Sequence, residues 1–143
     1  MCGRFTQDTS WAEVHAFMQP IALAASELPI EPAFNIAPSQ PCWALRAEQD
    51  ALEPVRMRWG LLPSWAKDAR SGYSTFNARA ESMAEKPAFR AAFRRRRCLV
   101  FASGYYEWTG EGKPVLLADL PLRVDRIFAC WRLPDAPFSI SQP

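Results

Sequence analysis

The sequence predicts an α+β domain built on an antiparallel sheet or open barrel, with a few flanking helices. Helical patterns occur in two isolated segments, residues 11–18 and a segment that begins at Pro87. Short segments with the alternation or apolar content of strands occur between and after them. Short strands mixed with isolated helices point to this class, and the 143 residues fit one domain with a sizeable core.

The first helix is expected to begin immediately after Ser10 and to run to about residue 18. Ser10 and Glu13 have the spacing of a capping box, and Pro20 stops the helix. The apolar residues on one helical face are Trp11, Val14, Phe17 and Met18. Residues 20–41 are rich in proline, alanine and serine, so we expect irregular structure there, with FNIAPSQP forming a turn between extended pieces.

Two strands are expected next, at CWALRA and VRMRWG. In the second strand apolar residues alternate with arginines, which gives one apolar and one basic face. GLLPSWAKDARSG is expected to be a loop. Pro87 is expected to open the second helix, with Phe89 and Phe93 facing inward and an arginine run closing it. CLVFASGYYEW predicts a strand, a Ser-Gly break and a second short strand, and the apolar VLLAD segment a further strand.

Composition indicates a folded protein with reduced thiols. Hydrophobic residues make up 49% of the chain, but no run approaches the roughly 18 apolar residues of a membrane span. The N-terminus also lacks a secretion signal, so we expect a cytoplasmic protein without membrane contact. The four cysteines form no C-x-x-C pair and His15 is the only histidine, so we expect no metal, no cofactor and no disulfide scaffold.

Arginine dominates the basic charge. The net charge is only +2, but Arg90 and residues 94–97 form a basic cluster. Arginine suits planar, bidentate contact with phosphate, so the cluster points to a polyanionic partner and a salt-sensitive binding contribution. The alternative is a solvated helix end whose arginines offset the helix dipole.

Cys2 is the first candidate reactive residue. If Met1 is removed, Cys2 carries a free α-amine and a free thiol, a pair that condenses with an aldehyde to an imine and then closes a five-membered thiazolidine. The ordinary pKa values of such groups leave both partly deprotonated near neutral pH. Two alternatives are an N-terminal nucleophile hydrolase and a cysteine with no role.

Three other segments carry candidate residues. In STFNARAES, an extended backbone would present Asn77, Arg79 and Glu81 on one face, whereas a helix start would make Asn77 a cap and the other two solvated charges. In SGYYEWTG, burial between aromatic residues would suit Glu107 to general acid chemistry, whereas plain alternation would leave it facing water. Trp65 offers a ring on which bases of single-stranded DNA stack, or a core side chain.

The order of several motifs resembles one family. MCGRF, FNIAPSQ, RWGLLPSWA, FNARAES and KPAFRAAFRRRRCLVFASGYYEW together resemble the SOS response-associated peptidase (SRAP) family over residues 1–114. The resemblance implies a single domain, residues 1–143, with an antiparallel β-barrel-like core and a positively charged groove for single-stranded DNA. It also implies that the protein forms a covalent thiazolidine crosslink with the aldehyde of a ring-opened abasic site.

The resemblance assigns a role to each matching residue. Cys2 is the crosslinking residue, Asn77 positions the reacting sugar or the cysteine, and Glu107 helps to open the sugar and transfers protons. Arg4 and Arg79 match arginines that bind the DNA backbone beside the lesion. With Trp65, these arginines form the expected DNA-binding set.

The implied protein acts in DNA damage and repair during the SOS response. It is expected to be a monomer in the bacterial cytoplasm, associated with the nucleoid during damage, with autopeptidase removal of Met1 and a lyase activity at abasic sites. The alternatives are a cysteine peptidase acting on protein substrates, which is a hydrolase, and an inactive single-stranded DNA binding remnant. Residues 115–143 diverge from the family and lack its late histidine, so a truncated or divergent C-terminal part and an incomplete barrel are expected.

Overall fold

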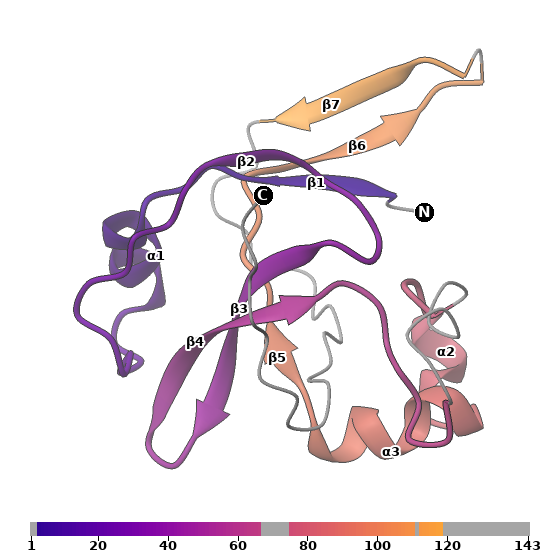
Figure 1. Cartoon of the computed structure of the whole chain (residues 1–143), viewed down its shortest axis with the longest axis horizontal. Coiled ribbons are helices and arrows are strands. Elements are labelled where there is room, and N and C mark those ends of the chain that lie inside the picture. The colour runs from indigo at the N-terminus through magenta and orange to yellow at the C-terminus, as the bar shows by residue number, and fades with distance from the viewer. Residues whose placement is uncertain (1–2, 67–74, 111, 119–143) are drawn as a thin grey trace, which may run out of the picture.

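The computed structural model describes residues 3–66, 75–110 and 112–118 (Figure 1). Their elements, in chain order, are β1 (Arg4–Gln7), α1 (Trp11–Met18), β2 (Ala33–Ile36), β3 (Pro41–Glu48), β4 (Ala51–Arg58), α2 (Ala80–Met83), α3 (Pro87–Arg95), β5 (Cys98–Leu99), β6 (Gly104–Trp108) and β7 (Pro114–Ala118). The predicted α+β class is confirmed. No helix within these ranges is long and apolar enough to cross a membrane.

The described strands form two antiparallel sheets. The first has the order β2-β1-β6-β7 and the second the order β4-β3-β5, and all the pairings between these strands are antiparallel. In Figure 1 the four-stranded sheet lies above the three-stranded one, with α1 beside them and α3 at the far end. Across the described ranges the two sheets do not close into a barrel, so the barrel-like core stays a prediction.

The first helix follows the sequence closely. Ser10 caps α1, with its Oγ accepting from the Glu13 backbone N–H at 3.3 Å, while the Glu13 carboxylate accepts from the Ser10 N–H at 2.9 Å. Trp11, Val14 and Met18 are buried as predicted, but Phe17 is 46% exposed. The expectation for Phe17 is therefore wrong. Only three of the four apolar residues of this short helix face the core, and Phe17 lies at the edge of that face.

Two clusters of buried side chains form on the two faces of β3. The inter-sheet cluster draws on strands of both sheets: Phe5, Ile36, Cys42, Ala44, Met57, Trp59, Cys98 and Val100. The α1 cluster packs the first helix on the opposite face of β3: Trp11, Val14, Met18, Leu45 and Phe101. Alternation along β3 explains the division, since successive side chains of a strand point to opposite faces.

A buried glutamine joins the first strand to the second sheet. The Gln7 side chain is 1% exposed and donates from Nε2 to the backbone oxygens of Trp43 and Phe101, both at 2.8 Å. Its Oε1 accepts from the Trp43 backbone N–H at 2.9 Å. All three bonds are buried or partly buried, so Gln7 satisfies backbone groups that would otherwise lose water without compensation.

The second long helix packs through a small residue. Pro87 occupies the first turn of α3, as predicted, and Ala92 is its buried residue, against Leu61. Phe89 is only partly buried beside this pair, and Phe93 is also partly buried. The two phenylalanines therefore lie on the inward side of α3, as predicted. Ala92 is more deeply buried than either, because its short side chain lets the helix lie close to Leu61.

Candidate functional site

Glu107 lies on the inner face of the four-stranded sheet. The register pairs Phe5 with Tyr105, and Glu107 follows two residues later on the same face of β6. Phe5 is in the inter-sheet cluster and Tyr105 packs against it, so this face covers the core. Glu107 is partly buried while Thr109 is exposed. The alternative in which Glu107 simply faces water with its neighbours is therefore wrong.

Asn77 is tied to the same core cluster from a different segment. The Trp59 indole N–H donates to the Phe76 backbone oxygen at 3.1 Å, and the two rings meet edge to face with centroids 6.2 Å apart. Trp59 in turn meets Phe5 edge to face at 5.1 Å. Asn77, the next residue after Phe76, is partly buried. Aromatic contacts thus connect the segment of Asn77 to the face of the sheet that carries Glu107.

The local structure around Asn77 differs from both expectations. Arg79 has an extended backbone, with φ −80° and ψ 130°, and occupies the N-cap position of α2 without a side-chain capping bond. Glu81 lies in the first turn of that helix. The prediction of an extended segment is therefore wrong at Glu81. The alternative prediction of a helix start is right, but its N-cap residue is Arg79 and not Asn77.

Arg4 lies on the opposite face of the sheet from Glu107. Its register partner is Tyr106, and cross-strand partners share a face. The Arg4 guanidinium donates from Nη1 to Asn35 Oδ1 at 2.8 Å, and the Tyr106 hydroxyl donates to the Phe34 backbone oxygen at 3.0 Å. Both bonds are made to β2, so Arg4 is held along the outer face rather than over the inner one.

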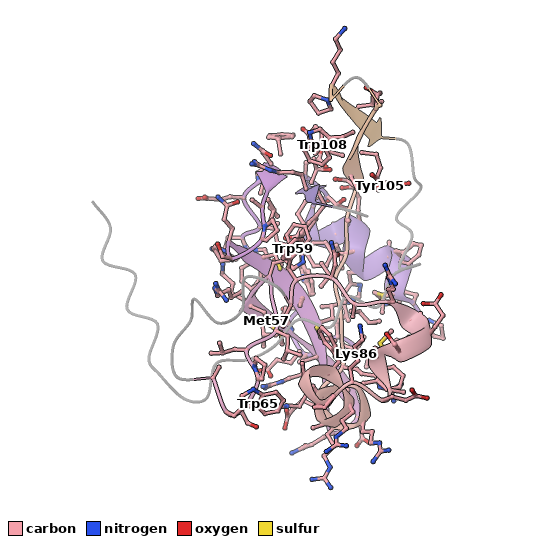
Figure 2. The ribbon with its side chains drawn as sticks, turned by 90° about the vertical axis from the view of Figure 1, so that its right-hand side faces the viewer. Met57, Trp59, Trp65, Lys86, Tyr105 and Trp108 are labelled. Carbon is pink, nitrogen blue, oxygen red and sulfur yellow. The ribbon has the colours of Figure 1, made fainter. Side chains whose placement is uncertain are left out.

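Arg79 and Trp65 are both exposed. Arg79 lies two residues after Asn77, at the start of α2. Trp65 is 61% exposed, so the alternative of a core side chain is wrong for this residue. Figure 2 places Trp65 at the opposite end of the molecule from Trp108, which neighbours Glu107. Phe76, next to Asn77, and Tyr105, two residues before Glu107, thus pack on one core cluster, whereas Trp65 is separated from Trp108 of the same strand as Glu107.

Cys2 lies outside the described residues, but Gly3, to which it is bonded, lies beside Trp108. A Cβ atom on Gly3 would lie 3.4 Å from the Trp108 ring. One further step of the β1–β6 register also places Gly3 opposite Glu107. Sequence reasoning did not select Trp108, although it is a large aromatic residue next to Glu107. Its contact with Gly3 depends on the pairing of β1 with β6, which the sequence does not reveal. Within the described ranges, no group of His, Cys, Asp and Glu side chains is arranged to hold a metal ion.

Comparisons with known proteins agree on one family. A family model described as SOS response associated peptidase (SRAP) matches residues 1–126. The abasic site processing protein YoaM of Bacillus subtilis is 36% identical over 131 residues, which cover 90% of this chain and 57% of that protein. The abasic site processing protein HMCES of Xenopus tropicalis is 36% identical over 90 residues, covering 54% of this chain and 27% of that protein.

Solved structures show the same fold. A protein from Bordetella bronchiseptica matches with a TM-score of 0.62 at 21% identity, over 80% of this chain and 55% of that one. A protein from Bacteroides thetaiotaomicron matches with a TM-score of 0.61 at 22% identity, over 80% of this chain and 52% of that one. The chain spans a little over half the length of YoaM. With the family model matching most of its residues and confirming the resemblance in its motifs, the chain belongs to the SOS response associated peptidase (SRAP) family.

Proposed function

We propose that this chain processes abasic sites in single-stranded DNA by forming a covalent thiazolidine crosslink through Cys2. The family match and the names of the relatives, abasic site processing proteins, support this assignment. The observation that carries it is the position of Asn77 and Glu107. Although distant in sequence, both are partly buried beside residues that pack on the inter-sheet cluster.

The chemistry requires an amine, a thiol and a proton carrier. The Cys2 α-amine, freed by removal of Met1, adds to the C1 aldehyde of the ring-opened sugar, and loss of water gives an imine. The Cys2 thiol then adds to the imine carbon while its proton passes to the nitrogen, which closes the thiazolidine. Glu107 delivers the proton to the departing hydroxyl, and Asn77 orients the sugar through its amide. The imine also permits β-elimination, so strand cleavage by a lyase reaction accompanies crosslinking.

The DNA partner is bound by charge and stacking. Arg79 is exposed beside Asn77 and is available to a phosphate next to the lesion, while exposed Trp65 offers a ring to a base. Arg4 contributes positive charge from the outer face of the sheet. The protein acts as a monomer on cytoplasmic DNA and associates with the nucleoid during DNA damage.

Incubating the purified chain with an abasic single-stranded oligonucleotide tests the proposal. Mass spectrometry first establishes that Met1 has been removed. We expect an adduct that survives denaturing electrophoresis, none with Cys2→Ala, and none with undamaged DNA. Cys2→Ser is the closer control in size and polarity; like Cys2→Ala it keeps the α-amine and forms an imine that borohydride traps, but neither variant can close a thiazolidine. A stable adduct of equal yield in Cys2→Ala would contradict the proposal.

The family description favours one second candidate, a thiol peptidase acting on proteins or on its own leader. A peptide-cleavage screen separates the two candidates, since a Cys2-dependent cut in an unrelated peptide supports the peptidase. A third outcome, salt-sensitive DNA binding that is equal for intact and abasic strands and indifferent to Cys2, would identify a binding module without chemistry.

A further inference from the structure

An arginine-lined hollow lies at the junction of α3 and β5, against the β3–β4 hairpin. Its volume is about 450 Å³. The charged residues that line it are Arg46, Glu48 and the consecutive residues 94–97, all arginines. Figure 1 shows α3 and β5 at the end of the molecule away from β6 and β7, so this hollow is separate from the strand that carries Glu107.

Arg46 forms the wall on the sheet side. It lies on β3 opposite Cys98 of β5 and Glu53 of β4. Its Nη2 contacts the carboxylate of Glu53 at 2.5 Å and that of Glu48 at 3.3 Å, which fixes the guanidinium. Its Nε is buried and has no hydrogen-bond partner among the described residues. Arg46 therefore brings a guanidinium that two carboxylates hold in position to the wall of the hollow.

The opposite wall is the end of α3. Arg94 and Arg95 lie in the last turn, where cations offset the helix dipole. That effect does not extend to Arg97, which lies past the helix, nor to Arg46, which comes from another element. Arg96 ends the helix, with its backbone N–H donating to the Ala92 oxygen at 2.8 Å. These four consecutive arginines are exposed, and together they line one side of the hollow.

The charge balance of this hollow favours an anion. Among the described lining residues, five guanidinium groups surround the space and Glu48 is the one carboxylate. Like charges that share a small volume raise the energy of the folded state, and a bound anion lowers it. Guanidinium groups form parallel hydrogen bonds with phosphate oxygens, which makes a phosphate the anion that best fits this lining.

We propose that this hollow is a phosphate-binding site that holds the backbone of the DNA strand at a distance from the abasic site. The identity of the strand rests on the proposed function, while the preference for phosphate rests on the arginines alone. Because the hollow is remote from Glu107, it adds affinity for longer strands and takes no part in the chemistry at the lesion.

The test compares two double variants that each remove two exposed positive charges. Arg94→Gln with Arg95→Gln removes them from the hollow, whereas Lys86→Gln with Lys113→Gln removes charges that do not line it. Fluorescence anisotropy measures the Kd of an intact single strand against salt concentration. We expect the slope of log affinity against log salt to become shallower by about 1.4 in the hollow variant, at about 0.7 per phosphate contact, and less in the control.

Three additional measurements separate phosphate binding from a loss of folding. Equal thermal midpoints of the two double variants establish that α3 still folds, and Arg94→Lys with Arg95→Lys keeps the salt slope while losing the bidentate geometry. Inorganic phosphate at constant ionic strength should weaken DNA binding of the wild type more than that of the hollow variant. If phosphate competes equally with both, or if both Gln variants lose the same affinity, the inference is overturned.

The inference and the proposed function fail in different ways. A short abasic oligonucleotide that reaches only the lesion site should crosslink to the hollow variant at the wild-type rate. If the crosslink forms normally but the hollow variant binds long strands like the control, only the inference fails. If no crosslink forms but the hollow variant still loses DNA binding, the proposed function fails and the phosphate site stands.

Discussion

The indole N–H of Trp59 donates a 3.1 Å hydrogen bond to the backbone oxygen of Phe76, the residue immediately before Asn77. This bond, together with the edge-to-face ring contacts from Phe5 to Trp59 and from Trp59 to Phe76, connects the Asn77 segment to the inner face of the four-stranded sheet. The position of a candidate catalytic side chain therefore depends on a buried aromatic residue that does not itself react.

Trp59→Phe is expected to slow crosslinking by more than its loss of stability accounts for. The change removes the bond to Phe76 and opens space in the inter-sheet cluster, at a cost of about 1–3 kcal/mol in the free energy of unfolding. Trp11→Phe is the matched control, because it removes a similar indole bond, 3.3 Å to the Ala25 oxygen, from the α1 cluster. Adduct formation is measured at a temperature where both variants are fully folded. Equal rates in the two variants would contradict the prediction.

Gln7→Leu is expected to lower the free energy of unfolding by about 2–5 kcal/mol, since it leaves the backbone groups of Trp43 and Phe101 buried without their partners. Urea unfolding measures the loss. Gln40→Leu is the control, because Gln40 is exposed and its side chain accepts a bond of 2.8 Å from the Ala37 N–H. A loss for Gln7→Leu no larger than that for Gln40→Leu would show that the three bonds contribute little.

Local patterns in the sequence were enough to predict several elements, but not β1 or the first half of β4. The capping box placed α1, Pro87 opened α3, and alternation of apolar residues and arginines identified β4. These signals succeed because they depend on neighbours within one or two turns of chain. The tail after β7 lies outside the described residues, so the divergent ending stays a prediction.

The candidate site was less accessible from the sequence because it depends on register. Sequence reasoning selected Glu107 from its aromatic neighbours, but the β1–β6 pairing decided that it shares the inner face with Phe5 while Arg4 lies on the outer face. The extended alternative for residues 77–81 is wrong at Glu81 because α2 begins between it and Asn77, whereas the helix-start alternative left Glu81 in solvent, as it is. A one-residue difference in helix start or strand pairing changes the face of a side chain, and no local pattern sets it.

The capping box predicts a pH dependence of stability. Hydrogen bonds from the Ser10 side chain and backbone hold the pKa of Glu13 below its ordinary value of 4.5. Because the folded pKa is lower than the unfolded one, this stabilisation is present above pH 4.5 and is lost as the pH falls through the folded pKa. The difference in unfolding free energy between the wild type and Ser10→Ala should therefore be larger at neutral pH than in acid. A difference that is constant with pH would contradict the prediction, and an NMR titration of Glu13 checks the pKa directly.

The contact between Gly3 and Trp108 predicts how much change the β1 end tolerates. A Cβ atom at Gly3 would lie 3.4 and 3.7 Å from two atoms of the Trp108 ring, which is ordinary contact. Gly3→Ala is therefore expected to fold normally, within about 0.5 kcal/mol of the wild type, and to crosslink at a similar rate. Gly3→Val adds two methyl groups against the ring and should slow adduct formation. Combining Gly3→Val with Trp108→Ala tests the cause, because removal of the ring should restore part of the rate if steric contact is responsible. If Gly3→Val crosslinks normally, the ring does not limit this part of the chain.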